Sequence, residues 1–472
     1  MQYSIVNFKT AKENIDFRYE PEFFLPKYIE YENKLSKKRT VRLRDCALFE
    51  NGRAFDSNEF SFDGDVYISK IGDVTQKRDY RSWEKVSRSH FERLKAKYLK
   101  HNDILMTLTG DPPDVGKTQL VFNPPEKTLS WNQRVALIRL KKQDNIVSPE
   151  YLFITLSTKY CREHIERWAK GVRQRNVGNP AVLNMSVPEF SLKFQNYLAE
   201  IIKRAFNLSD NSYLYYSQAE QILLTELGLA NWKPKYQQSF IKTFSDTQSA
   251  DRIDAEYFQL VYEEIIKAVK SARNYAYLGD LVSIKKCIEP GSDAYQDSGI
   301  PFVRVSNLSK FGINSDNQQF ISESLYESLK THQPKKGEIL LSKDATPGIA
   351  YYLSDVPGKM IPSSGILRLT VKDVGKIIPE YLTLVLASVV VQKQIERDVG
   401  GSVINHWLVD QVKEAMIPVL PDSIQKEISD KIAESFIRRE QSKKLLDIAK
   451  HGVEKAIEKS EEEALKWINK EV

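Results

Sequence analysis

The sequence predicts an α+β protein that contains two copies of one globular unit, each followed by a long helix. Three observations predict it: an internal repeat with a nearly constant offset, short apolar runs bounded by turn residues in both copies, and two apolar seams at helical spacing. The 472 residues allow roughly three domains at about 150 residues each. With 41% hydrophobic and 28% charged residues, the chain has a globular rather than a disordered composition.

The internal repeat is clearest where residues 148–171 align with residues 378–401, at a shift of 230. Upstream of this stretch the offset becomes about 235, so that RYEPEFF at 18–24 resembles RIDAEYF at 252–258. A constant offset over some sixty residues is not explained by composition. The matching positions are Pro149, Glu150, Tyr151, Leu152, Ile165, Glu166, Arg167, Gly171, Pro188, Gln195, Ile202 and Phe206 with Pro379, Glu380, Tyr381, Leu382, Ile395, Glu396, Arg397, Gly401, Pro418, Gln425, Ile432 and Phe436.

Each copy begins with a short segment, residues 17–35 or 250–272, and the second version has the apolar spacing of a helix. About 140 residues follow, in which short apolar runs alternate with Gly, Pro, Asp and Asn and therefore predict strands. Residues 148–171 and 378–401 then predict one helix each, with proline in the first turn and glycine at the end. The predicted strands are DVYISKI, DILMTLT and RVALIRL in the first copy and PFVRVSN, EILLSKD and GILRLTV in the second.

Each copy ends in a long helical pattern whose apolar residues are spaced by three or four positions, the signature of a coiled coil. Residues 195–228 would span roughly 51 Å as one helix. The polar stretch NLSDNS at 207–212 is expected to fray or bend this helix. Two equivalent seams predict that the helices pair with each other; the alternative is two unrelated surface helices, each packed on its own domain.

Composition excludes several classes of protein. The 69 Lys and Arg against 63 Asp and Glu give a charge of +6, which permits a polyanionic partner without requiring one. Cys46, Cys161 and Cys287 are far apart and form no CxxC pair, which argues against a disulfide scaffold or a cysteine zinc site and favours a reducing compartment. The first residues have no signal-peptide pattern, and the apolar run at 381–391 is too short to span a bilayer. We therefore expect a cytoplasmic protein without a membrane partner.

Motifs for catalysis, metals and cofactors are weak. TGDPPDVGKTQLV at 109–121 resembles a P-loop, but five residues separate its glycines and two of them are prolines, so we expect a turn between strands. NPPE at 123–126 lacks the aromatic residue of the amino-methyltransferase motif. None of the six histidines forms a zinc-binding pair, and no nucleophile elbow occurs. The sequence therefore predicts no catalytic residue, no metal and no cofactor.

Polar and basic loops are the remaining candidates for a functional site, because Arg, Asn, Gln and Ser are the side chains that recognise base edges. They occupy corresponding places in the two copies but differ in content. Each one taken alone could be a solvated loop residue. The candidates for DNA binding are Lys70, Gln76, Lys77, Arg78, Arg81, Arg173, Gln174, Arg175 and Asn176 in the first copy, and Arg304, Asn307, Lys343, Ser402, Asn405 and His406 in the second.

The order of these motifs resembles the specificity subunit of type I restriction–modification enzymes. The resemblance covers nearly the whole chain and lies in ADRIDAEYF, DILMTLTGDPPDVGK, EILLSKDATPG, PEYL and PDSIQKEI, with the weaker EFSLKFQNYL in the first copy. It implies two pseudo-symmetric target-recognition domains separated by two long antiparallel helices. The expected boundaries are 1–190 and 236–420 for the recognition domains, the second with its leading linker and helix, and 191–235 and 421–472 for the helical spacers.

The resemblance also implies a mechanism and partners. Each recognition domain would bind one half of a bipartite double-stranded DNA target, and the helices would set the distance between the halves. The helical regions would also dock methyltransferase subunits, two being expected, and restriction subunits would join through that complex. Residues of the helical seams expected at the partner-binding regions are Leu198, Ile202, Leu223, Leu227, Ile428, Ile432, Leu445 and Ile448.

Two other functions stay open at the level of sequence. The chain could be a self-contained restriction or modification enzyme with a cryptic active site, which incubation with a labelled methyl donor would reveal. It could also be a duplicated scaffold that docks partner helices without binding a specific DNA sequence, which the modest charge permits.

Overall fold

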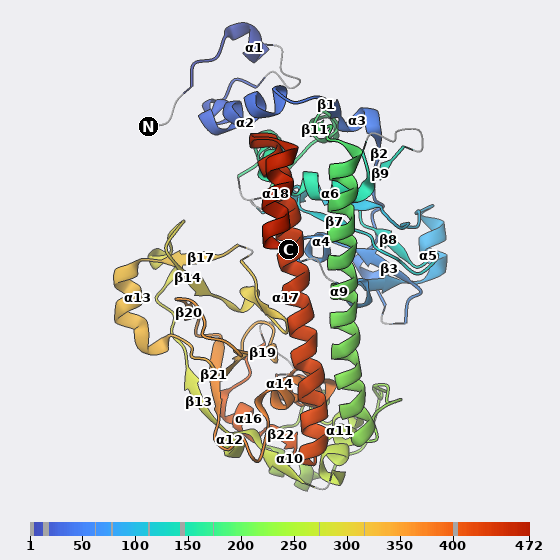
Figure 1. Cartoon of the computed structure of the whole chain (residues 1–472). Coiled ribbons are helices and arrows are strands. Elements are labelled where there is room, and N and C mark those ends of the chain that lie inside the picture. The colour runs from blue at the N-terminus through green and yellow to red at the C-terminus, as the bar shows by residue number, and fades with distance from the viewer. Residues whose placement is uncertain are drawn as a thin grey trace. The chain divides into compact units, whose positions relative to one another are not determined.

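The chain folds into two compact units, described here from a computed structural model (Figure 1). The structure describes residues 4–12, 18–61, 63–76, 79–111, 114–141, 147–172, 174–272, 274–315, 317–399 and 405–472, with the backbone alone at Phe8 and Thr10. Unit 1 consists of residues 1–209 and 440–472, and unit 2 of residues 210–439. Unit 1 therefore takes its residues from both ends of the sequence.

Each unit contains a four-stranded antiparallel sheet with the same strand order. In unit 1 the order is β2-β9-β5-β7, and in unit 2 it is β13-β21-β18-β19. The central strands β5 and β18 are buried along their whole length, in keeping with the apolar runs at 104–106 and 339–341. The strand bounds are β2 Ala47–Asn51, β5 Ile104–Thr107, β7 Thr118–Leu120, β9 Val135–Leu140, β13 Val282–Lys286, β18 Glu338–Ser342, β19 Ala350–Tyr352 and β21 Ile366–Val371.

A three-stranded sheet and a two-stranded sheet also repeat. The orders β4-β3-β8 and β17-β14-β20 each combine one antiparallel and one parallel pair, and β1-β11 corresponds to β12-β22. All six predicted strand segments are therefore confirmed as strands. The bounds are β1 Thr40–Arg42, β3 Val66–Ser69, β4 Glu84–Val86, β8 Leu129–Trp131, β11 Ser186–Pro188, β12 Tyr275–Tyr277, β14 Ile300–Val303, β17 Gln319–Ile321, β20 Ile361–Pro362 and β22 Met416–Pro418.

The helix predicted after these strands is two helices in each copy, so the prediction of one continuous helix is wrong. Unit 1 has α6 (Pro149–Leu156) and α7 (Lys159–Trp168), and unit 2 has α14 (Pro379–Ala387) and α15 (Val389–Val399). Hydroxyl groups stop the first helix in both cases. Thr158 Oγ1 donates to the carbonyl of Thr155 at 2.6 Å, and Ser388 Oγ donates to that of Val385 at 2.7 Å. Proline occupies the first turn of α6 and α14, as predicted.

The same polar contacts brace both units. In unit 1 Arg139 forms a double hydrogen bond with Asp103, and in unit 2 Arg368 forms one with Glu338. The phenol groups of Tyr151 and Tyr381 donate to proline carbonyls at 2.8 Å in each case. Because these contacts recur at the repeat offset, the duplication extends from sequence to side-chain geometry.

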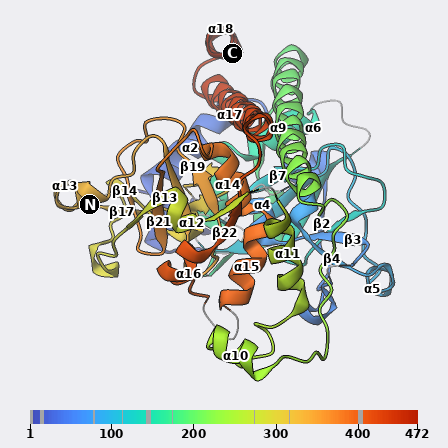
Figure 2. The ribbon, with the colours of Figure 1, turned by 90° about the horizontal axis from the view of Figure 1, so that it is seen from below.

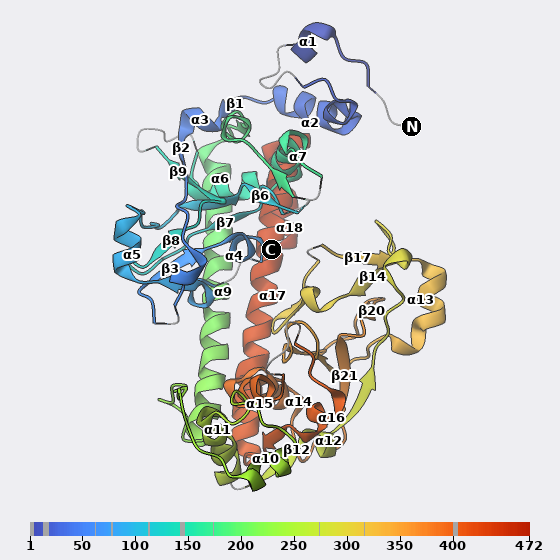
Figure 3. The same cartoon turned by 180° about the vertical axis from the view of Figure 1, so that it is seen from behind.

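The two long helices are α9 (Leu192–Glu226) and α17 (Asp422–Glu458), and each contributes to both units. They lie side by side in Figures 1 and 3, and α18 (Glu461–Glu471) follows α17. The contacts of Ser212 with Ser435 and of Gln218 with Lys431 show that they run antiparallel. The expected break at 207–212 does not occur. Ser435 donates to the carbonyl of Ser212 at 2.8 Å, and the two hydroxyl oxygens lie 3.1 Å apart.

Each unit has its own apolar core, to which the long helices contribute. In unit 1 the first part of α9 packs with the last part of α17 and with α18, and in unit 2 the remaining parts pack together. The eight residues expected to bind partners all lie inside these cores, so that expectation is wrong for them: they hold the chain's own helices together. They are Leu198, Ile202, Leu445 and Ile448 in unit 1, and Leu223, Leu227, Ile428 and Ile432 in unit 2.

The opening segments precede the sheets. Unit 1 begins with α1 (Phe8–Lys12), η1 (Pro21–Phe24) and α2 (Pro26–Ser36), and unit 2 has α10 (Phe244–Ala250) and α11 (Leu260–Ser271). Figure 2 shows α11 beside α15 within unit 2. The leading linker expected for the second recognition domain is helical in part, because Thr243 and Asp246 form a capping box at the start of α10.

Short elements connect the sheets and helices. The three cysteines are buried, and none of them forms a disulfide bond. Among the described residues no helix has the length and hydropathy to cross a membrane, and no cluster of three or more potential metal ligands occurs. The connecting elements are α3 Leu43–Cys46, η2 Ser57–Glu59, α4 Ile71–Thr75, η3 Tyr80–Ser82, α5 Arg88–Arg93, β6 Thr109–Gly110, β10 Arg175–Asn176, α8 Asn179–Leu183, α12 Leu278–Leu281, η4 Ser292–Ala294, η5 Val305–Asn307, β15 Leu308–Ser309, β16 Gly312–Ile313, α13 Glu323–Leu329, η6 Lys330–His332 and α16 Val409–Glu414.

Candidate nucleic-acid interface

In unit 1 two loops meet beyond the end of the central strand β5. We call them the first loop pair: residues 108–111 and 114–117, between β5 and β7, and residues 169–172 and 174–178, which follow α7. The strand β6 of the turn pairs with β10 of the second loop. Thr109 Oγ1 also donates to Oδ1 of Asn176 at 2.5 Å, and Val177 N donates to the Leu108 carbonyl at 2.9 Å. The turn joins two antiparallel strands, which confirms the strand-to-strand turn predicted for this P-loop-like segment.

The first loop pair presents three of the predicted site residues. Gln174 and Asn176 are exposed, and the half-buried Arg175 forms an ion pair with Glu166 of α7. Nε of Arg175 is buried and has no hydrogen-bond partner within the described residues. The loop is tight: a Cβ atom on Gly171, which has φ +111°, would lie 2.2 Å from the Gln174 carbonyl oxygen. Glycine is therefore required at this position.

In unit 2 the corresponding loops meet in the same way. The second loop pair consists of residues 343–349, after β18, and residues 405–408, after α15. Trp407 N donates to the Lys343 carbonyl at 2.7 Å, and Ala345 N donates to the Asn405 carbonyl at 3.0 Å. Asp344 and His406 form an isolated β-bridge. The backbone frame of the first loop pair is thus repeated.

The side chains of the second loop pair differ from those of the first. Nδ1 of His406 lies 2.9 Å from Oδ1 of Asp344, and Lys343 Nζ lies 2.5 Å from Oδ2 of the same carboxylate. Asn405 and His406 are exposed. Asp344 therefore gathers Lys343 and the exposed His406 around one carboxylate, and the exposed amide of Asn405 lies next to His406 in the chain.

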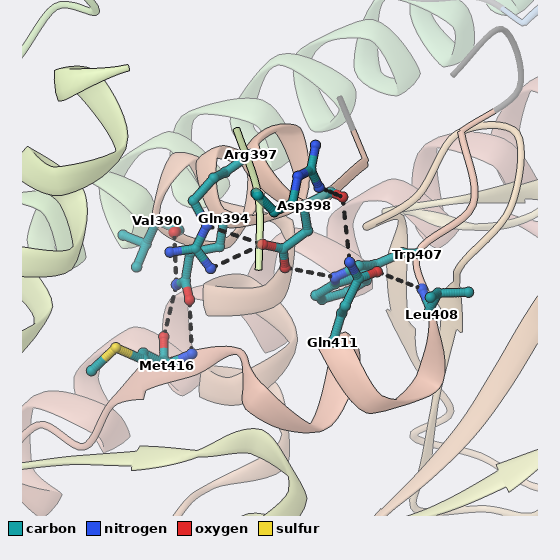
Figure 4. A network of polar contacts seen from close by, with 9 residues as sticks. Val390, Gln394, Arg397, Asp398, Trp407, Leu408, Gln411 and Met416 are labelled. Carbon is teal, nitrogen blue, oxygen red and sulfur yellow. Dashed lines mark hydrogen bonds and ion pairs between the residues drawn. The ribbon is translucent and has the colours of Figure 1, made fainter. Parts of the chain in front are cut away.

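A polar network underlies the second loop pair (Figure 4). The Asp398 carboxylate at the end of α15 accepts hydrogen bonds from Arg397 Nε at 3.0 Å and from Nε1 of Trp407 at 3.3 Å. Gln411 Nε2 donates to the Asp398 carbonyl, and its Oε1 accepts from Leu408 N. Burial raises the pKa of Asp398, although the charge of Arg397 and the hydrogen bond from Trp407 oppose this shift.

A second group of predicted residues lies at corresponding helix starts. Lys70 precedes α4 and Arg304 precedes η5, and the backbone N–H of each donates to a side chain three residues later, at Asp73 and Asn307. Lys70 pairs with Glu84 and lies over the ring of Phe60, while Nη2 of Arg304 donates to the carbonyl of Asn317 at 2.5 Å.

Of the other predicted residues near these helix starts, Gln76 and Arg81 are exposed and Asn307 is buried. Gln76 ends α4, and the exposed Arg81 in η3 pairs with Asp79 at 2.8 Å. Asn307 is fully buried and caps η5, so the prediction that it contacts DNA is wrong. Nε of Arg304 is buried without a hydrogen-bond partner among the described residues. Four predicted site residues lie outside the described residues: Lys77, Arg78, Arg173 and Ser402.

Sequence reasoning missed the carboxylates that pair with the basic side chains of both loop pairs. Glu166 and Asp344 hold Arg175, Lys343 and His406, but a search for basic and amide side chains passes over carboxylates. A signal existed in the sequence, since Asp344 directly follows the predicted Lys343. Glu166 matches Glu396 in the repeat, but its pairing with Arg175 depends on the fold.

A family model described as "Type I restriction modification DNA specificity domain" matches the chain twice, over residues 36–212 and 274–447. This chain belongs to that family. Each match contains one complete loop pair, so the two sites lie in two copies of the specificity domain. A curated member, the specificity subunit of the type I restriction enzyme MjaVIII from Methanocaldococcus jannaschii, is 26% identical over 172 residues. That match covers 36% of this chain and 39% of the relative, less than half the length of either.

Solved structures of the family are more distant in sequence. The S subunit of a type I restriction–modification system from M. genitalium is 14% identical, with a TM-score of 0.40 over 89% of this chain and 94% of its own. The HsdS subunit from Thermoanaerobacter tengcongensis is 16% identical, with a TM-score of 0.28 over 89% and 97% of the two chains. Membership of the specificity-domain family rests on the double match of the family model.

Proposed function

We propose that this chain is the non-catalytic DNA-specificity subunit of a type I restriction–modification complex. The observation that carries the proposal is the duplicated specificity domain, in which one backbone frame presents different side chains in its two copies. A protein that binds two copies of the same ligand would keep the side chains as well as the frame. Different side chains on one frame suit a DNA target with two unlike halves.

The loop pairs supply the chemistry for base recognition. Arginine pairs with guanine through two hydrogen bonds, and asparagine or glutamine pairs with adenine in the same way. The first loop pair offers Gln174, Arg175 and Asn176, and the second offers Lys343, Asn405 and His406. We propose that Lys70, Arg81 and Arg304 contact phosphates through their charge and Gln76 through its amide, and that these contacts set the register. Lys77, Arg78, Arg173 and Ser402 stay in the proposal from their positions in the sequence.

The long helices suit a spacer between the two half-sites. The 35 residues of α9 correspond to about 52 Å of helix. Half-sites recognised from one face of DNA lie about 34–36 Å apart, one helical turn. A helix of this length suffices to separate two domains by that distance.

The proposal assigns methyl transfer and DNA cleavage to partner chains. The duplication of the specificity domain suggests two methyltransferase subunits, one for each copy, with restriction subunits joining through that complex. Since the apolar seams of α9 and α17 are buried, a partner would use the outer faces of these helices. Leu214 and Ile437 are exposed there, at 53% and 50%.

The experiment that tests the proposal compares genomic DNA from the native host with and without this gene, using sequencing that detects N6-methyladenine. Loss of methylation at one bipartite motif, two short half-sites around a fixed gap, is the expected result. Unchanged methylation would contradict the proposal. Incubation of the purified chain with DNA and a labelled methyl donor is the control, and incorporation without partners would point to an enzyme instead.

A further inference from the structure

We propose that Asp398 and Trp407 are positioning residues, which hold Asn405 and His406 in the geometry needed to recognise one half of the DNA target. The inference rests on the proposed function, which it deepens by naming residues that control recognition without touching DNA. Asp398 lies in the last turn of α15, and Trp407 directly follows the exposed His406. Their hydrogen bond therefore links the end of α15 to the segment at 405–408, which carries two candidate base-contacting side chains.

Hydrogen bonds with three segments of unit 2 hold Asp398 in position. Its carboxylate bonds Arg397 and Trp407, and its carbonyl accepts from Gln411 Nε2 at 3.3 Å and from Nη1 of Arg252 at 3.2 Å (Figure 4 shows the first three). Arg252 is itself held by two hydrogen bonds to Asp254, at 2.7 and 2.6 Å. The end of α15 is thus tied to the opening segment of unit 2.

Trp407 is also held in position, by burial of its indole and by backbone hydrogen bonds. The indole is fully buried and is the largest such side chain in the described part of the molecule. The Trp407 backbone N–H donates to the Lys343 carbonyl, and the Asn405 carbonyl accepts from Ala345 N. Trp407 therefore fixes the backbone of the two residues before it against the turn at 343–345. Any shift of the indole would move His406 relative to Asp344.

A purely structural role would not require a carboxylate at this place. A buried carboxylate is costly to desolvate, and apolar packing could replace it without loss of stability. A hydrogen bond between Asp398 and Trp407 instead fixes one orientation of the indole, which apolar packing would leave less defined. In unit 1 the position matching Asp398 holds Trp168, and the neighbouring Arg167 is anchored to Phe23 and Glu32. The ends of α7 and α15 are thus both bonded to the opening segment of their own unit, but the residue at the position of Asp398 differs.

The test uses the assembled complex with its methyltransferase subunits and measures kcat/KM for methylation of the target and of targets altered in either half. Trp407→Phe removes the indole N–H and keeps an aromatic ring. We expect discrimination at one half-target to fall about 10-fold, the scale of one lost base contact, while the other half is recognised as before. Asp398→Asn keeps an acceptor for the indole N–H and should therefore retain most of the wild-type discrimination between half-targets.

The matched control is Trp232→Phe. Trp232 lies in the same unit, and its indole donates to a carboxylate, Glu264 Oε2, at 2.8 Å, outside the second loop pair. This control should leave both half-targets unchanged. Equal losses at both halves, or a lower melting temperature of the Trp407→Phe complex with unchanged discrimination, would overturn the inference while the proposed function stands. If the wild-type complex recognises no bipartite target, the proposed function fails and this inference fails with it.

Discussion

Single side chains divide into those that repeat between the two units and those that differ. Gln195 and Gln425 repeat: each accepts a hydrogen bond at 2.9 Å from the backbone N–H at the start of the helix that carries PEYL. The exposed side chains of the loops differ, with Gln174 and Asn176 in one unit and Asn405 and His406 in the other. The repeated residues build the frame, and we expect variants of the exposed residues to change DNA preference with little effect on stability.

Arg175→Ala is expected to relax the preference at a single base pair and to cost about 1–3 kcal/mol of binding free energy to the preferred DNA. The reason is that a guanidinium gives discrimination only where it bonds a base edge. Competition binding to targets changed one base pair at a time measures the effect. The comparison is Lys95→Ala, because we expect this exposed lysine to contact phosphate. This variant should weaken binding to all sequences alike, with a smaller salt dependence. Uniform weakening by Arg175→Ala would assign Arg175 to a phosphate instead.

His164 should make unit 1 sensitive to mild acid. Burial lowers the pKa of its imidazole to about 4, and Nε2 lies 2.9 Å from the Ala181 carbonyl oxygen, to which it donates. Between pH 6.5 and 4 the unfolded chain binds a proton that the folded chain does not. The stability from neutral His164 is therefore complete above about pH 6.5 and is lost as the pH falls.

From pH 7.5 to 5 this group should remove about 2 kcal/mol from the free energy of unfolding. His164→Gln keeps a donor for the Ala181 carbonyl and has no titration in this range. Urea unfolding of both proteins at the two pH values measures the difference. If the variant loses as much stability as the wild type, another group is responsible.

At the scale of elements, strands followed from the sequence more closely than helices did. The apolar runs at 104–106 and 339–341 predicted the central strands, because a strand buried on both faces is apolar at consecutive positions. The division of the PEYL helices did not follow, since it depends on the hydroxyl groups of Thr158 and Ser388 bonding to carbonyls of the preceding turn. Helix α9 continues through NLSDNS because Ser212 finds a partner on α17, which local propensity does not describe.

The candidate site was predictable in part for the same reason. Residue types located the loops that carry Arg175 and His406, but their carboxylate partners and the burial of Asn307 depend on tertiary packing. The prediction of an apolar seam on each long helix was correct. Their assignment to partner binding failed because the sequence does not show which chain covers an apolar face.

The serine pair between α9 and α17 gives a prediction about these helices. Ser435→Ala should lower the free energy of unfolding by about 1 kcal/mol, because it leaves the buried Ser212 hydroxyl without its partner. The double variant Ser212→Ala/Ser435→Ala should lose less than the sum of the two single losses. Urea unfolding of the four proteins provides this cycle, and Ser217→Ala on the exposed face of α9 should be neutral. Additive losses would show that the two hydroxyls are not coupled.

For the whole molecule, the two units predict how specificity can be exchanged. Residues 252–420 lie entirely within unit 2, whereas residues 440–472 belong to unit 1. Replacing 252–420 by the matching segment of a family member with another target should change one half-target and preserve the other. Methylome sequencing of a host carrying the hybrid measures this outcome. A change in both halves would contradict the model of two independent modules.

Replacing everything after residue 251 should instead impair the protein. Such a hybrid would carry foreign versions of Leu445, Ile448 and Val453 into the core of unit 1. Thermal unfolding of the two hybrids should therefore show the lower midpoint for the longer replacement.

The discontinuous core of unit 1 also has a consequence for synthesis on the ribosome. The first part of α9 is made early, but the segments of α17 and α18 that cover it come after the 210–439 segment. At 5–20 residues per second, translation of these about 230 residues takes on the order of 10 to 50 s. During that time Leu198 and Ile202 face solvent or a chaperone, while the segment that forms unit 2 emerges as one continuous stretch. A nascent chain that stops before residue 440 would therefore release a complete second module joined to an open first one, a substrate for proteolysis.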